Sequence, residues 1–242
     1  MQAAAWLQPS ARKFAMPLLP TLVRSNSLAQ QGYSTIRRAI RDGSIARGQF
    51  FSETTFAKSL GVSRTPVREA LLNLFRDGVV EIVPKRGFRL AELDEAAITE
   101  IRLLRVALER LVIGRLCVTA TAEDIRELRA ILAGKGRNRD DIFGIDEIFH
   151  VRMAELAGLH QIKRMLLSVR GKMYLIASGA RVAGTRNDKV AREHAAIVDA
   201  LERHDCAKAS AAISSHIERS IDAFEAARAG LATSQRRPGR HT

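Results

Sequence analysis

The sequence predicts a mainly α-helical protein, made of an N-terminal winged helix-turn-helix followed by an all-α helical bundle. Two short helical segments joined by a glycine-containing turn predict the helix-turn-helix, and two β-rich runs joined by a basic turn predict its wing. After Asp94 the strand-like runs give way to apolar residues at helical spacing, which predicts the bundle. We therefore expect a flexible leader at 1–25, a winged helix-turn-helix at 26–93, a helical domain at 94–229 and a basic tail at 230–242.

Composition narrows the classes of function. The 242 residues are enough for two small domains with separate cores, and 46% apolar with 27% charged residues is the balance of a globular protein. The longest apolar runs span only a few residues, far below the roughly 20 that cross a bilayer. A formal charge of +13 favours a polyanionic partner, with nucleic acid ahead of an anionic membrane surface. The first 94 residues hold 14 Lys and Arg against 7 Asp and Glu, so this half is the better candidate for binding DNA.

The number and spacing of the cysteines indicate the redox environment of the protein. Cys117 and Cys206 are too few and too far apart in the sequence for a disulfide framework. We therefore expect a reducing environment and a cytoplasmic location.

Caps and breakers predict the elements of the N-terminal domain. A first helix over 27–42 ends at a glycine, and a link over 44–51 follows. Ser52 suits the N-cap of a second helix, which Gly61 ends, and Ser63 suits the N-cap of a third. The β-rich runs 79–83 and 87–90 then form a hairpin with a basic tip.

The start of the third helix and the tip of the hairpin carry the candidate DNA contacts. The first residues of the second helix of a helix-turn-helix enter the major groove, where an arginine such as Arg64 can bind guanine through two hydrogen bonds. Hydroxyl side chains and helix N–H groups at such a position suit phosphate oxygens. The alternative is that these residues form only a solvated face, but their occurrence at both places favours DNA. The candidates are Ser63, Arg64, Thr65 and Arg68 on the helix, and Lys85, Arg86 and Gly87 on the wing.

The sequence of the second domain predicts about six helices. The first, over 95–119, has Ile98, Ile101, Leu104, Leu108, Leu111 and Val112 on one side. Further helical segments are expected at 121–134, 140–157, 160–182, 188–204 and 206–229.

Three histidines and one aspartate in this domain could hold a metal ion. Asp146 and His150 are four residues apart and so project from one helix face, while His194 and His216 fall in two other predicted helices. Three imidazoles and a carboxylate can bind Zn²⁺ or a similar divalent ion. Three alternatives remain: unrelated core or surface histidines, a metalloenzyme that activates water, and histidines that bind an organic anion without metal.

The sequence of the predicted recognition helix, called the reading helix below, resembles that of a known protein family. Gly61-Val62-Ser63-Arg64-Thr65-Pro66-Val67-Arg68-Glu69-Ala70-Leu71 resembles the recognition segment of the GntR family of bacterial transcription regulators. The resemblance implies that Ser63, Arg64, Thr65, Pro66 and Arg68, with the wing glycine Gly87, approach DNA. The family usually has Arg directly after the residue matching Glu53, whereas this chain has Thr54, so its operator preference is expected to differ.

The second domain resembles the FCD effector domain of the FadR-type branch of that family. The resemblance rests on Asp146-Glu147-Ile148-Phe149-His150, His194-Ala195-Ala196-Ile197 and His216-Ile217, and on an opening helix with Leu104-Arg105-Val106-Ala107-Leu108-Glu109. It implies that Asp146, His150, His194 and His216 bind a divalent ion, for which the donor set favours Zn with Ni or Mn as alternatives, and that Arg105 faces a small carboxylate effector. It further implies a homodimer that binds a palindromic operator in double-stranded DNA and represses transcription, with no enzymatic activity and no membrane partner.

Overall fold

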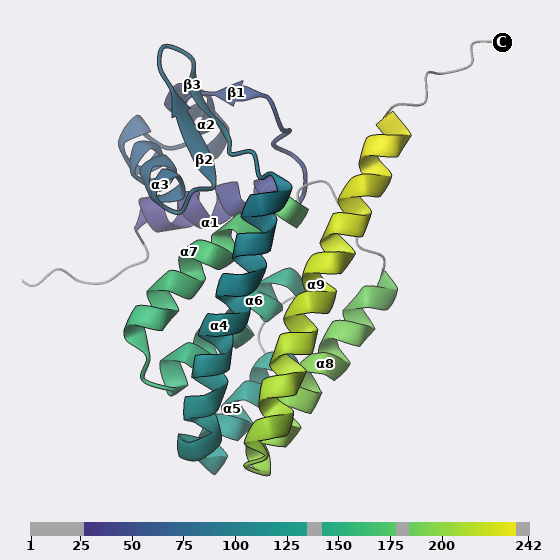
Figure 1. Cartoon of the computed structure of the whole chain (residues 1–242). Coiled ribbons are helices and arrows are strands. Elements are labelled where there is room, and N and C mark those ends of the chain that lie inside the picture. Colours follow the sequence, from purple (N-terminus) through teal and green to yellow (C-terminus); the bar gives the residue numbers. More distant parts are fainter. Residues whose placement is uncertain (1–26, 135–141, 178–183, 236–242) are drawn as a thin grey trace, which may run out of the picture.

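The computed structural model describes residues 27–134, 142–177 and 184–235, so the predicted leader and the end of the predicted tail lie outside the described residues. A small winged-helix domain lies at one end of a bundle of long helices (Figure 1). The predicted fold class is confirmed: a small sheet occurs in the N-terminal domain, and the described part of the second domain is helical. Among the described helices, none has an apolar stretch long enough to cross a bilayer.

The N-terminal helices begin and end where local chemistry sets them. Helix α1 covers Leu28–Arg41, α2 covers Glu53–Leu60 and α3 covers Arg64–Arg76. The Ser52 side chain accepts a hydrogen bond from the Thr55 amide, which caps α2 as predicted. Gly61 ends α2 in the left-handed conformation, with φ 66°. Ser63 occupies the N-cap position of α3, but its side chain makes no capping hydrogen bond.

The wing is a three-stranded antiparallel sheet in the order β1-β3-β2. Strands β2 (Val80–Val83) and β3 (Gly87–Leu90) form the predicted hairpin. Strand β1 (Phe50–Phe51) pairs with β3 and corrects the prediction that residues 44–51 are only a link. Two residues are too short a run for a period of two to be visible, so only the pairing with β3 reveals this strand.

The second domain contains six described helices. These are α4 (Glu95–Thr119), α5 (Ala122–Leu132), α6 (Ile142–Leu156), α7 (His160–Ala177), α8 (Gly184–Glu202) and α9 (Cys206–Gln235). Helices α4 and α9 run side by side along the length of the bundle, and α8 packs against α9 (Figure 1). Helix α8 starts at Gly184, earlier than the predicted 188, and α9 continues beyond the predicted 229.

The predicted apolar side of α4 needs a correction. Ile98, Ile101, Leu108 and Val112 are buried, but Leu104 and Leu111 are 44% and 59% exposed. Positions 104 and 111 precede 105 and 112 by one residue, which turns their side chains about 100° around the helix. The inward position is taken instead by Arg105, which is 1% exposed. A buried charge at this place could not be inferred from hydrophobic periodicity.

Two apolar cores form, and one helix joins them. The winged-helix core surrounds Ile36, Leu71 and Phe88, and the bundle core contains residues such as Phe149 and Ile217. Each such side chain stabilises the fold by roughly 1.5–3 kcal/mol when fully buried. Tyr174 and Leu175 of α7 belong to the winged-helix core, so a helix of the bundle packs directly against the N-terminal domain.

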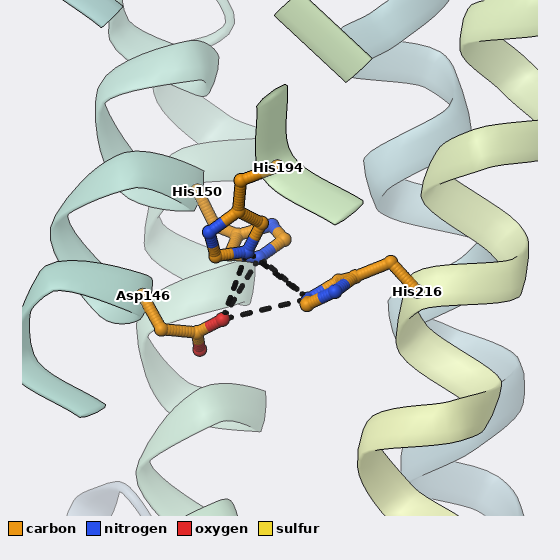
Figure 2. Close-up of side chains that lie close together, drawn as sticks. All are labelled: Asp146, His150, His194 and His216. Atoms are coloured by element: carbon orange, nitrogen blue, oxygen red, sulfur yellow. Dashed lines mark hydrogen bonds and ion pairs between the residues drawn. The ribbon is translucent and has the colours of Figure 1, made fainter. Parts of the chain in front are cut away.

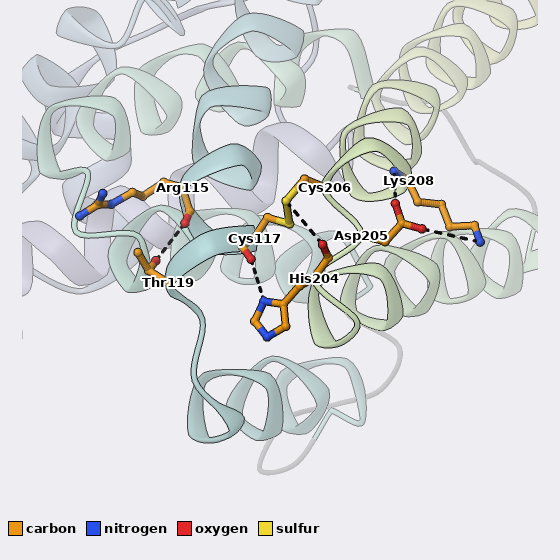
Figure 3. The surroundings of a disulfide bond; sticks show 7 residues. All are labelled: Arg115, Cys117, Thr119, His204, Asp205, Cys206 and Lys208. Atoms are coloured by element: carbon orange, nitrogen blue, oxygen red, sulfur yellow. Dashed lines mark hydrogen bonds and ion pairs between the residues drawn. A yellow bond between two sulfur atoms is a disulfide. The ribbon is translucent and has the colours of Figure 1, made fainter.

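The two cysteines form a disulfide, which corrects the expectation drawn from their sequence separation. Cys117, near the end of α4, is bonded to Cys206, the first residue of α9, 89 residues later (Figure 3). Their Cα atoms are 5.5 Å apart, because α4 and α9 are neighbours in the bundle. His204 also contacts this junction: its Nδ1 lies 2.8 Å from the Cys117 carbonyl oxygen.

Candidate functional site

The start of α3 presents the predicted DNA contacts to solvent. Ser63, Thr65 and both predicted arginines are exposed, whereas Pro66 is half-buried. Glu53 at the start of α2 lies 3.0 Å from an Arg64 guanidinium nitrogen and 3.6 Å from one of Arg68. Exposed ion pairs of this kind contribute about 0.2–1 kcal/mol, so the arginines can exchange Glu53 for phosphate or base. Sequence reasoning missed this carboxylate, because it is 11 residues away from Arg64.

The wing tip packs against strand β1 of the same domain. Lys85 has φ 61° at the turn between β2 and β3, and Arg86 places its guanidinium carbon 3.8 Å from the centre of the Phe50 ring. Both basic side chains are exposed. A β-carbon at Gly87 would lie 2.5 Å from the Phe51 carbonyl oxygen, and the residue has φ 101°. The pairing of β1 with β3 thus requires glycine at position 87. This structural requirement holds independently of the predicted contact of Gly87 with DNA.

The four predicted metal ligands converge on one point inside the bundle (Figure 2). Helix α6 supplies Asp146 and His150, α8 supplies His194 and α9 supplies His216. The Nε2 atom of His194 lies 3.1 Å from Asp146 Oδ1, and those of His150 and His216 each lie 3.4 Å from it. The His216 Nε2 atom is 3.2 Å from that of His150 and 3.3 Å from that of His194.

These separations fit a divalent transition metal. Ligand atoms at about 2.0–2.1 Å from a tetrahedral ion lie roughly 3.3 Å from one another. The five separations given above, from 3.1 to 3.4 Å, match that value. The sixth separation, between His150 and His194, is at most 4.8 Å, so four donors from three helices converge closely enough that they could hold one ion.

The second nitrogen of two histidines is oriented by a carboxylate. His150 Nδ1 lies against the carboxylate of Glu109 from α4, and His216 Nδ1 lies 2.8 Å from Glu193 Oε2 on α8. Such contacts place the proton on Nδ1 and leave the Nε2 lone pair for a metal. Sequence reasoning missed both glutamates, since neither follows its histidine at a fixed short spacing.

Burial and charge set the protonation of the ligands. Burial lowers the pKa of His194 to about 3 and also lowers the pKa of His150, so both imidazoles are neutral at pH 7. Burial alone would raise the pKa of Asp146, but the Arg170 guanidinium and hydrogen bonds from the histidines hold it well below its usual range. Neutral imidazoles and an ionised carboxylate are the forms that bind metal.

Two buried arginines lie beside the four ligands. Arg170 of α7 forms ion pairs with Asp146 and, at 3.4 Å, with Glu109. Arg105, which the sequence singled out, is paired with Glu109 at 2.9 Å. One Arg105 guanidinium nitrogen, Nη2, is buried with no hydrogen-bond partner among the described residues. The sequence did not single out Arg170, because an arginine in an amphipathic helix is usually solvated.

Comparison with known proteins decides the family. The model of bacterial regulatory proteins of the gntR family matches residues 28–90, and the FCD domain model matches residues 100–219. An uncharacterised HTH-type transcriptional regulator in an unstable DNA locus of Streptomyces ambofaciens is 30% identical over 204 residues, which cover 81% of this chain and 85% of that protein. The chain belongs to the gntR family.

Further relatives of this gntR-family chain agree. The HTH-type transcriptional repressor RspR of Escherichia coli is 26% identical over 194 residues, or 78% of this chain and 85% of that protein. The solved structure of E. coli McbR/YncC is similar in fold, with a TM-score of 0.71 and 20% identity over 82% of this chain and 97% of that chain.

The gntR-family membership settles the class of function. The chain is a DNA-binding transcriptional regulator with a helix-turn-helix and an FCD domain. The metalloenzyme alternative is wrong, because the matched families and the relatives are transcriptional regulators.

Proposed function

We propose that this regulator is a repressor whose affinity for DNA is set by a small carboxylate, bound at a divalent metal ion held by Asp146, His150, His194 and His216. The observation that carries the proposal is the convergence of three Nε2 atoms and one carboxylate oxygen in a buried site, all within 4.8 Å of one another. The repressive sign is supported by the relative named a repressor in E. coli.

Charge supports a carboxylate as the effector. A divalent ion together with Arg105 and Arg170 places more positive charge in the buried site than Asp146 and Glu109 neutralise. Uncompensated buried charge is unfavourable, so the site favours an anionic ligand that binds the metal and an arginine together. The unpartnered Nη2 atom of Arg105 is the candidate second contact.

The set of donors favours particular ions. Three imidazole nitrogens and one carboxylate oxygen suit Zn²⁺ best, with Ni²⁺ or Mn²⁺ as alternatives. The alternative in which the histidines bind an organic anion directly is less well supported. His150 and His194 are held neutral, and Asp146 would repel an anion in the same place.

The domain architecture supports the proposed operator and oligomeric state. Two copies of a helix-turn-helix related by a two-fold axis bind two half-sites of a palindrome in double-stranded DNA. The proposed DNA contacts are Ser63, Arg64, Thr65, Pro66 and Arg68 with Lys85, Arg86 and Gly87 on the wing. We place the protein in the cytoplasm, where such operators occur.

The dimer surface proposed here is the outer face of α4. Leu104, Leu111 and Val118 recur at intervals of seven and are 44%, 59% and 76% exposed, which is a pattern typical of paired helices. Beside them α4 and α9 form an open groove of about 650 Å³ that contains both Arg110 and Glu218. Opposite charges on one self-complementary face can pair across a two-fold axis, so a second copy of this chain is the occupant we propose.

Metal content tests the proposal directly. Protein purified without chelator is expected to carry about one divalent ion per chain by elemental mass spectrometry. His194→Ala removes a ligand from a preorganised site and is expected to lose that ion, whereas His160→Ala, which alters an exposed histidine on α7, is expected to keep it. A chain that binds no metal, or a His194→Ala variant that keeps it, would contradict the metal site.

A further inference from the structure

We infer that Glu147, Arg37 and Tyr174 form a clamp that couples the metal–effector site to the DNA-binding domain. The inference rests on the proposed function, because it describes how the state of that site reaches the reading helix. It is carried by contacts between three helices, two from the bundle and one from the winged helix.

The clamp is a buried ion pair across the domain boundary. Arg37 of α1 is 7% exposed, and its guanidinium lies 2.8 Å from a carboxylate oxygen of Glu147 on α6. Its guanidinium carbon lies 4.2 Å from the centre of the Tyr174 ring on α7. The Tyr174 hydroxyl donates a hydrogen bond to the same glutamate. Burial, followed by the charge of Glu147, raises the pKa of Tyr174, so this hydroxyl stays protonated and remains a donor.

Each bundle helix carries one clamp residue and one residue of the metal site. On α6, Glu147 directly follows the ligand Asp146. On α7, Tyr174 lies one turn after Arg170, the arginine that is paired with Asp146. Close to the four ligands, α6 and α7 are therefore joined by Arg170 with Asp146 and by Tyr174 with Glu147. Binding of the Asp146 carboxylate to an ion would weaken its pairing with Arg170 and so change how α6 and α7 lie against each other, and the clamp lies at that contact.

The other end of the clamp leads to the reading helix. Helix α1 packs against both α7 and α3 (Figure 1). Four residues before Arg37 on α1, the Tyr33 hydroxyl donates a hydrogen bond of 2.5 Å to Asp77, the C-cap of α3. A displacement of Arg37 thus moves α1, the helix against which α3 packs. An Arg47 side chain that donates to the Leu175 carbonyl fixes the same boundary at a second point.

The coupling has a defined thermodynamic meaning. A ligand changes DNA affinity only through its different affinity for two arrangements of the domains, and coupling of this kind typically amounts to roughly 5- to 150-fold. The clamp is the contact that distinguishes the two arrangements. Without it, each domain keeps its own binding but no longer responds to the other.

The test compares Glu147→Gln with Glu155→Gln, using Zn²⁺ alone as the probe. Glutamine keeps the shape of Glu147 but removes the charge that holds Arg37. Glu155 is also on α6 and also pairs with α7, through Lys163, but it does not reach α1, so it is a matched control. Tyr174→Phe serves as a milder second variant, because it keeps the ring beside Arg37 and removes only the hydroxyl.

Two readouts are followed, amide hydrogen exchange in α1 and zinc stoichiometry. In the wild type and in Glu155→Gln, we expect Zn²⁺ to slow exchange at the amides around Arg37. In Glu147→Gln we expect that slowing to be lost, and in Tyr174→Phe to be reduced, while all variants still bind about one Zn²⁺ per chain. The affinity for a DNA duplex selected from a random pool should likewise stop responding to Zn²⁺ in Glu147→Gln.

The outcomes separate the inference from the proposed function. A wild type that binds Zn²⁺ with no change at α1, or a Glu147→Gln variant that responds as the wild type does, overturns the clamp and leaves the metal site standing. A wild type that binds no Zn²⁺ overturns the metal site itself, and the stoichiometry reveals that failure independently of exchange in α1.

Discussion

Arg64 is the first residue of α3 and Arg68 lies one turn later, and both lie near Glu53 of α2. In the DNA contact proposed here, both arginines are already positioned by a neighbouring helix, and a phosphate or base would replace Glu53 as their partner.

Replacing Arg64 with alanine tests the reading helix. A bidentate contact to guanine contributes about 1–3 kcal/mol of discrimination, so Arg64→Ala should weaken binding to a selected duplex by roughly tenfold to a hundredfold. Fluorescence anisotropy at one fixed salt concentration measures the change. Arg76→Ala, at the far end of the same helix, is the control and should have little effect. Equal affinities for the two variants would remove Arg64 from the DNA contacts.

Glu109 lies beside the proposed metal site without being one of its ligands. It is buried, lies against His150 and is paired with Arg105 and Arg170. Burial opposes its ionisation, but the charge of Arg105, the contact with the His150 ring and the charge of Arg170 outweigh that effect and hold its pKa below its usual range. It therefore stays ionised at neutral pH and orients the His150 ring.

Glu109→Gln removes that charge and keeps the volume of the side chain. Loss of such an orienting partner typically lowers metal affinity by about 10- to 100-fold. Competition with a chromogenic zinc chelator measures this affinity. Glu127→Gln, which removes a surface partner of Arg152, is the matched control. An unchanged zinc affinity in Glu109→Gln would mean that zinc binding does not depend on orientation of His150 by the Glu109 carboxylate.

At the scale of elements, the disulfide fixes the ends of two neighbouring helices. It joins α4 to α9 across 89 residues of chain, and a loop of that length restricts the unfolded state by about 4–5 kcal/mol in the chain-entropy treatment.

Urea denaturation with and without reductant measures that contribution. The free energy of unfolding of the wild type should fall by several kcal/mol when reductant is added, in keeping with the roughly 2–5 kcal/mol that native disulfides contribute. Cys206→Ser is the informative variant, because Cys206 is exposed whereas Cys117 is buried. The variant should unfold at the lower urea concentration in both conditions. If reductant leaves the wild-type midpoint unchanged, the disulfide contributes nothing to stability.

Elements set by short-range chemistry could be predicted from the sequence, and those set by distant partners could not. Ser52, Gly61 and the pair Asp146 and His150 act within one or two turns of chain, so their patterns are visible in the sequence. By contrast, β1 exists only because β3 lies beside it, and Leu104 is exposed because Arg105 takes the inward position next to it. Glu193 likewise reaches His216 from another helix.

At the scale of the whole molecule, the outer face of α4 decides the oligomeric state that we propose. Leu111→Asp places a charge in the middle of the exposed stripe and should convert a dimer into a monomer, because an unpaired charge is strongly unfavourable when it is buried in an interface. Size-exclusion chromatography with light scattering measures the mass. Met165→Asp, at an exposed apolar residue on α7, is the control and should leave the mass unchanged. A Leu111→Asp variant that remains dimeric would place the interface elsewhere.

The bond between Cys117 and Cys206 also closes a covalent ring that contains Asp146, His150 and His194 but leaves His216 outside. A protease that cuts once anywhere inside this ring produces no separate fragments until the disulfide is reduced. The two pieces stay tethered beside α9, and three of the four ligands remain in one molecule with the fourth. As long as the disulfide stays oxidised, a single cut in this part of the backbone therefore does not separate the N-terminal domain from the metal ligands that we propose.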